Sequence, residues 1–289
     1  MKADNLIVLV LIVQGLVILF HFPDQNYKIL IVDRIFSFDD ILNEPLILVG
    51  GYMSSGTSLI RSILDVHPEC KCGPEIKISF ESLKLVESLN ETKINQEKME
   101  KAMGIFSYFT YMTNVEPTYH ICNKEPGNLR FISYFKRVFP RSKFLMVVRD
   151  GREAAYSWIN RNGMGKNFKI FFSVLKAWNK FNNQAYNQCI ETGLDYCKII
   201  YYNKLVTNAE EEIGEMAKFL NLKWTDRFLN HQKYLGKDIK LAKHEYSLYG
   251  IKKQINADSL NNWVGKISDY DEELVANEID MLRTYKFIS

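Results

Sequence analysis

The chain has no run of lysine or arginine residues, and its net charge is only +3 over 289 residues. This balance argues against a nucleic-acid partner. It also contains no CxxC pair and no cysteine–histidine spacing of the kind that binds zinc, so no metal is expected. There is no internal repeat or low-complexity tract. With 47% hydrophobic residues, the sequence predicts one sizeable globular core.

The N-terminal segment is the longest apolar stretch. Residues 6–20 are apolar except for Gln14 and Gly15, and residues 6–22 give 17 positions, the low end of what spans a bilayer. We favour an uncleaved signal anchor at 6–22, with a short cytoplasmic tail (1–5), a stem (23–44) and a lumenal domain (45–289). A cleaved signal peptide is the main alternative, although no small-x-small cleavage site follows, and a buried core helix is a third.

The cysteines and the glycosylation sequon fit the secretory lumen. Cys189 and Cys197 lie eight positions apart across a predicted helix-to-strand corner at Gly193, so they could close a small disulfide loop. Cys72 and Cys122 each lie beside a predicted element. Asn90 begins the single Asn-x-Thr sequon, in a polar loop where a glycan would fit.

From residue 46 onward, apolar strands alternate with helical patterns, which is typical of an α/β fold with a parallel sheet and right-handed crossovers. The predicted strands are 46–49, 119–123, 143–148 and 198–202. The predicted helices are 57–67, 76–89, 96–111, 128–138, 153–160, 169–191, 210–220 and 271–285. Residues 246–266 are polar and predict a long loop, and such loops are often functional lids.

A glycine-rich turn, residues 50–58, lies between the first predicted strand and helix. Its spacing matches GxxxxGK[ST] of nucleotide triphosphatases, except that Thr57 stands in place of the lysine. Backbone N–H groups of such a turn can bind phosphate. The missing lysine predicts a phosphate-bearing donor whose transferred group is not a Mg-bound γ-phosphate. A kinase is therefore the least favoured enzyme class.

Polar groups also follow the other predicted strands. Lys124 and Arg149 each come directly after a strand, and Ser157 and Arg161 follow on one helix face at i, i+4 spacing. Tyr202 ends the last strand. Each of these residues alone is more often a solvated or ion-paired surface group. Because ligands of open parallel sheets bind beyond the carboxyl ends of the strands, their conjunction with the glycine-rich turn predicts an anion site there.

Taken together and in order, several sequence runs resemble the protein-tyrosine sulfotransferases, a family of Golgi enzymes that use 3′-phosphoadenosine 5′-phosphosulfate (PAPS). The matching runs are Gly50-Gly51-x-x-x-Ser55-Gly56-Thr57, Leu64-Asp65-x-His67-Pro68-Glu69-x-x-Cys72-Gly73-x-Glu75, Cys122-Asn123-Lys124-Glu125-Pro126, residues 139–152, Asn187-Gln188-Cys189 and residues 262–267.

The resemblance implies a P-loop-like sulfotransferase fold, in which helices flank a central parallel sheet. It implies transfer of a sulfuryl group from PAPS to tyrosines in acidic sites of secreted and membrane proteins, leaving adenosine 3′,5′-bisphosphate (PAP). No metal is required. It further implies a homodimeric, single-pass type II protein of the Golgi membrane.

The same resemblance assigns roles to residues. Glu75 would be the general base, Lys124 would stabilise the leaving phosphate, and Ser247 would assist there. The residues implied for the nucleotide are Ser54, Ser55, Gly56, Thr57 and Ser58 for the 5′-phosphosulfate, Arg149, Ser157 and Arg161 for the 3′-phosphate, and Tyr202 with the loop from Ser247 to Asn256. The disulfides implied are Cys72–Cys122 and Cys189–Cys197, which leaves Cys70 as a thiol.

The chain departs from the family pattern at charged positions. The family loop usually reads Pro-Arg-Ser-Gly-Thr-Thr, and here Ser54 replaces the arginine. Asn262 replaces a lysine, and Glu81 replaces an arginine on the expected acceptor face, where Lys77 keeps its charge. These changes leave two alternatives beside an active tyrosine sulfotransferase: a catalytically weak paralogue that serves as a PAPS-binding or regulatory partner, and a carbohydrate sulfotransferase.

Overall fold

The computed structural model describes residues 37–76, 83–84, 95–115, 118–240 and 251–288. The chain divides into two compact units, residues 1–41 and 42–289. Helix α1 (Phe38–Leu42) spans this division. No helix within the described ranges is long and apolar enough to cross a membrane. The predicted anchor at 6–22, the sequon residue Asn90, and Lys77, Glu81 and Ser247 lie outside those ranges.

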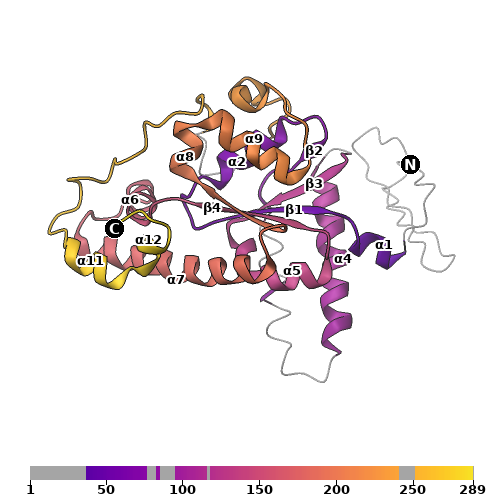
Figure 1. Ribbon diagram of the computed structural model, residues 1–289, viewed down its shortest axis with the longest axis horizontal. Coiled ribbons are helices and arrows are strands. Elements are labelled where there is room, and N and C mark those ends of the chain that lie inside the picture. Colours follow the sequence, from indigo (N-terminus) through magenta and orange to yellow (C-terminus); the bar gives the residue numbers. More distant parts are fainter. Residues whose placement is uncertain (1–36, 77–82, 85–94, 116–117, 241–250, 289) are drawn as a thin grey trace, which may run out of the picture. The chain divides into compact units, whose positions relative to one another are not determined.

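Five parallel strands form one sheet in the order β2-β3-β1-β4-β5 (Figure 1). The strands are β1 (Leu46–Gly50), β2 (Cys70–Lys71), β3 (His120–Lys124), β4 (Lys143–Val148) and β5 (Cys197–Tyr201). Every residue of β1 is buried, as expected of a parallel strand with both faces covered. The chain continues from β1 to one side of the sheet and returns past it to β4 on the other. The carboxyl ends of β3, β1 and β4 therefore meet at a switch point, where ligands of such sheets bind.

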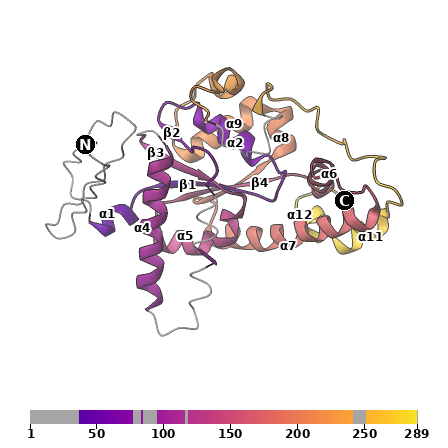
Figure 2. The ribbon, with the colours of Figure 1, turned by 180° about the vertical axis from the view of Figure 1, so that it is seen from behind.

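Helices cover both faces of the sheet. In both ribbon views α2, α8 and α9 lie on one face, with α5 and α7 on the other (Figures 1 and 2). Apolar side chains of α2 and α9, such as Ile60 and Met216, pack with Val147 of β4 in a buried cluster. The helices are α2 (Thr57–Asp65), α4 (Gln96–Asn114), η1 (Pro126–Phe131), α5 (Ile132–Val138), α6 (Gly151–Arg161), α7 (Phe168–Thr192), α8 (Tyr202–Thr207), α9 (Ala209–Leu220), η2 (Phe228–Tyr234), α11 (Glu272–Glu278) and α12 (Asp280–Thr284).

The predicted α/β fold with a parallel sheet is confirmed, and all four predicted strands are present within about one residue of their predicted bounds. The two-residue strand β2 was not predicted, because two residues carry no periodic signal. The predicted helix at 76–89 lies mostly outside the described residues.

Three predicted elements need correction. The helix predicted at 128–138 is a 3₁₀ turn, η1, followed by α5. Tyr202 begins α8 instead of ending β5. The helix predicted at 271–285 is broken at Ile279, where φ is −116° and ψ is 74°. A tertiary contact explains this break, because Asn179 of α7 accepts a hydrogen bond from the Met281 N–H at 3.0 Å and so caps α12.

Candidate active site

The glycine-rich turn connects β1 to α2, and its shape depends on two glycines. A Cβ on Gly51 would lie 2.5 Å from the carbonyl oxygen of Val147 in β4. Gly56 has a φ of 102°, and a Cβ there would lie 2.5 Å from the ring of Tyr202. The turn therefore packs closely against its neighbours and leads directly into the N-terminus of α2, an arrangement suited to an anion.

Beside this turn is a cavity of about 550 Å³. Residues predicted for the nucleotide that line it are Ser54, Gly56, Thr57, Ser58, Arg149, Ser157, Arg161, Tyr202 and Asn256. Asn262 also lies in the lining. Ser55 is instead buried, and its hydroxyl has no hydrogen-bond partner among the residues that the structure describes. Ser247 lies outside the described residues.

Arg149 anchors the cavity wall. Its Nε donates to Glu153 Oε2 at 2.9 Å, and its Nη2 donates to the carbonyl oxygen of Ser259 at 2.9 Å. The guanidinium lies 4.5 Å from the ring centre of Tyr202, a cation–π contact. The Tyr202 hydroxyl is 2.9 Å from Ser259 Oγ. These contacts orient a buried positive charge at the end of β4.

Arg161 places a second positive charge beside the turn. Its Nη2 donates to Ser54 Oγ at 2.6 Å, and Ser157 Oγ lies 3.5 Å away. Packing around the guanidinium, together with the neighbouring charge of Arg149, lowers the pKa of Arg161. Two guanidiniums that repel each other across the same cavity wall favour a bound anion between them.

Glu75 and Lys124 form a close ion pair, with 2.5 Å between Glu75 Oε2 and Lys124 Nζ. The Lys124 side chain is 1% exposed, whereas that of Glu75 is 23% exposed. Lys124 ends β3 and is in register with Val49, the residue directly before the glycine-rich turn. The pair therefore lies at the switch-point edge, with a partly exposed carboxylate and a buried ammonium.

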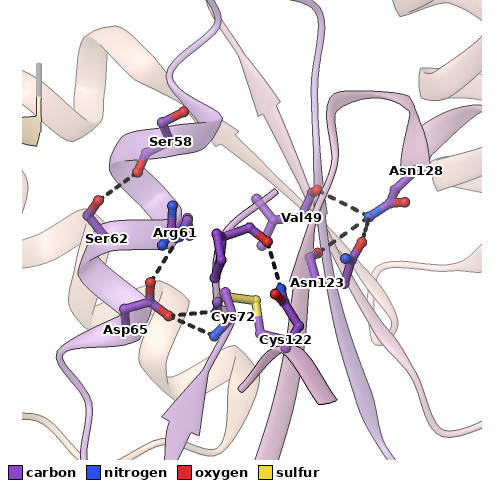
Figure 3. Close-up of a disulfide and its surroundings, with 12 residues drawn as sticks. Val49, Ser58, Arg61, Ser62, Asp65, Cys72, Cys122, Asn123 and Asn128 are labelled. Carbon is purple, nitrogen blue, oxygen red and sulfur yellow. Dashed lines mark hydrogen bonds and ion pairs between the residues drawn. A yellow bond between two sulfur atoms is a disulfide. The ribbon is translucent and has the colours of Figure 1, made fainter. Parts of the chain in front are cut away.

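A disulfide holds the two segments that carry this pair. It joins Cys72, three residues before Glu75, to Cys122, two residues before Lys124. Figure 3 shows Asp65 of α2 pointing toward the same bridge, where its Oδ1 accepts the Cys72 N–H at 2.7 Å. On the β3 side, Asn128 Nδ2 donates to Asn123 Oδ1 at 2.8 Å. The bridge Cys189–Cys197 joins the end of α7 to β5, and both disulfide expectations agree with the structure.

The family model described as "Sulfotransferase family" matches residues 45–226 of the chain. The chain belongs to the sulfotransferase family. Protein-tyrosine sulfotransferase 2 of Gallus gallus is 35% identical over 237 residues, covering 77% of this chain and 64% of that protein. A putative protein-tyrosine sulfotransferase of Caenorhabditis briggsae is 30% identical over 233 residues, covering 78% of this chain and 83% of that protein.

A solved sulfotransferase domain, from the Synechococcus PCC 7002 olefin synthase, shares the fold. Its TM-score is 0.63 at 15% sequence identity, with 85% of this chain and 95% of that chain covered. The first relatives named by sequence similarity are longer proteins, and this chain spans somewhat less than two thirds of their length.

Sequence reasoning assigned no role to several residues that shape this site. Ser259 contacts both Arg149 and Tyr202, and Glu153 accepts the Asn261 N–H at 2.7 Å as well as pairing with Arg149. Tyr156, Asn160 and Trp263 line the cavity. Ser259 is 110 residues from Arg149 along the chain, so no local pattern could have joined them.

Proposed function

We propose that this chain transfers the sulfuryl group of PAPS to tyrosine hydroxyls of secreted and membrane proteins, with PAP as the other product. One observation carries the proposal: an accessible carboxylate, Glu75, is paired with a buried ammonium, Lys124, at the sheet edge that also carries an anion-binding turn. The relatives named above support tyrosine as the acceptor. The proposal also includes a homodimer and the Golgi membrane as the location.

The residues present fit the proposed donor. The turn offers backbone N–H groups and the hydroxyls of Thr57 and Ser58 to a phosphosulfate, while Arg149 and Arg161 supply two guanidiniums to a second phosphate. The buried Ser55 hydroxyl, which has no partner among the described residues, fits a ligand that accepts its hydrogen bond. Tyr202 gives the cavity an aromatic wall.

The pair of charges suits sulfuryl transfer from this donor, which supplies an activated sulfur. Glu75 accepts the proton of the tyrosine hydroxyl, whose pKa of about 10 makes a base useful near neutral pH. The tyrosine oxygen forms a bond to sulfur while the bond from sulfur to the 5′-phosphate oxygen breaks. Lys124 stabilises the charge on that departing phosphate. The proton leaves Glu75 for solvent after the sulfated product departs.

In this geometry, Ser54 does not favour the alternative of a catalytically weak paralogue. The family arginine at this position is absent, but the Arg161 guanidinium reaches Ser54 from α6. A positive charge is thus kept beside the turn. This contact supports an active enzyme over a paralogue that only binds PAPS.

We further propose that the domain works in the secretory lumen behind an anchor at residues 6–22, with Asn90 as a glycan site. The two disulfides support an oxidising compartment, because such bridges persist there and are rare in the cytosol.

The test uses the full chain in detergent with labelled PAPS and an acidic tyrosine peptide. We expect Glu75→Gln to lower turnover by about 10²-fold or more, and Glu69→Gln, a nearby carboxylate, to leave it unchanged. PAP affinity, measured by calorimetry, should be the same in all three proteins. Transfer to a glycan acceptor but not to the peptide would replace tyrosine by carbohydrate as the substrate. PAP binding without transfer to either acceptor would contradict an enzymatic role.

A further inference from the structure

We propose that Asn114, at the end of α4, is a positioning residue that orients the Glu75 carboxylate for proton transfer. This inference rests on the proposed function. Asn114 Nδ2 donates to the carbonyl oxygen of Pro74 at 2.7 Å. That carbonyl belongs to the peptide group that joins Pro74 to Glu75. Since the peptide group is planar, holding its oxygen fixes the direction in which the chain enters Glu75.

The backbone of Asn114 makes a second contact with the same segment. A Cβ on Gly73 would lie 2.5 Å from the Asn114 carbonyl oxygen, and Gly73 has a φ of 64°. Only glycine fits this approach without a shift of backbone atoms. The end of α4 therefore packs against the segment just before Glu75 and also hydrogen-bonds to it.

The segment is held from the opposite side by α2. Asp65 Oδ1 accepts the N–H groups of Cys72 at 2.7 Å and Gly73 at 3.2 Å (Figure 3). Its other oxygen, Oδ2, accepts from Arg61 Nε at 2.9 Å, and both of these side chains are almost fully buried. Burial raises the pKa of Asp65, and the charge of Arg61 opposes that shift. The contacts that α2 makes with this segment are therefore part of the buried core.

These contacts have two different roles: some stabilise the core, and one orients Glu75. Asp65 and the Cys72–Cys122 bridge hold the first two residues of the segment inside the core. Asn114 is half-buried and holds the last peptide group before Glu75. Removing its side-chain amide frees that peptide group while leaving the buried contacts in place. A displacement of about 1 Å in a reacting group can lower a rate by about 10²-fold.

The experiment compares Asn114→Ala and Asn114→Asp with Thr113→Ala in the full chain. Thr113 is the matched control, because its hydroxyl bonds to Thr110 on the same helix end and does not touch the Glu75 segment. We expect both Asn114 variants to lower kcat by about 10- to 100-fold, with KM for PAPS within about twofold of wild type. The melting temperature should stay close to that of wild type, and Thr113→Ala should match wild type throughout.

A double-variant cycle separates positioning from a general structural role. In single turnovers with excess enzyme, adding Asn114→Ala to Glu75→Gln should hardly lower the residual rate further, since the base that Asn114 orients is already gone. The inference is overturned if Asn114→Ala keeps wild-type kcat, loses PAP affinity together with kcat, or slows Glu75→Gln by its full factor. A wild-type chain without transfer activity overturns the proposed function as well, whereas these three outcomes in an active chain leave it standing.

Discussion

The guanidinium of Arg161 lies 2.6 Å from the hydroxyl of Ser54, measured from Nη2 to Oγ. These residues are 107 positions apart in the chain, one on α6 and one in the glycine-rich turn. The contact puts a cation beside the one turn position where the family pattern predicts an arginine and the sequence has none. Arg161 thus has two expected partners, the turn and the bound anion.

Replacing Arg161 should weaken the nucleotide site. We expect Arg161→Ala to lower PAP affinity about tenfold or more, because a hydrogen bond to a charged group contributes about 1.5–3 kcal/mol. Arg161→Lys keeps the charge but loses the bidentate geometry, so its PAP affinity should lie between those of wild type and Arg161→Ala. Calorimetric titration with PAP measures this, with Arg141→Ala, whose partner is the Asn43 carbonyl, as the control. Unchanged affinity in Arg161→Ala would remove this residue from the site.

The backbone of Ser54 should show its strain in a comparison of glycine and alanine. Ser54 has a φ of 69°, in the left-handed region. Ser54→Gly and Ser54→Ala both lose the hydroxyl that Arg161 contacts, and they differ only in the Cβ. We expect the glycine variant to have the higher free energy of unfolding by about 1 kcal/mol in urea titrations. Equal stabilities would mean that this position is not strained.

Removal of the two disulfides should have different effects on activity. The Cys72–Cys122 bridge closes a separation of 50 residues and the Cys189–Cys197 bridge one of 8. Serine replacement of both cysteines should cost about 4 kcal/mol of unfolding free energy for the first bridge and about 2.5 kcal/mol for the second. Because only the first joins the segments of Glu75 and Lys124, only its loss should lower turnover in protein that is still folded. Equal turnover losses would show that the first bridge has no special link to the ion pair.

Stability should fall in mild acid because of His231. This side chain is fully buried, and burial lowers its pKa from 6.5 to about 4. Between these values the unfolded chain binds a proton that the folded chain does not, so stability is lost as pH falls from about 6.5 toward 4. Between pH 7 and pH 5, wild type should lose about 2 kcal/mol more than His231→Phe in urea titrations. Parallel losses in the two proteins would assign the acid sensitivity to other groups.

Local patterns were sufficient for four of the five strands of the sheet and for the positions of their ends. Apolar runs predicted β1, β3, β4 and β5, and Lys124 and Arg149, at or just after the ends of two of them, could be expected at one edge because parallel strands end there. Patterns failed where a distant contact decides the backbone. Asn179 of α7 breaks the last predicted helix, and no feature of residues 271–285 shows this.

The composition, the glycine-rich turn and the family motifs of the sequence were enough to determine an α/β sulfotransferase fold and many of the residues that line its cavity. These signals are local, since they depend on the spacing of neighbouring residues along one strand, turn or helix. Only the tertiary structure decided which of these residues meet. It brought Arg161 to Ser54, Glu75 to Lys124 and Asn114 to Pro74, across separations of 107, 49 and 40 residues. Such pairings depend on how the helices pack on the sheet, which no local spacing encodes.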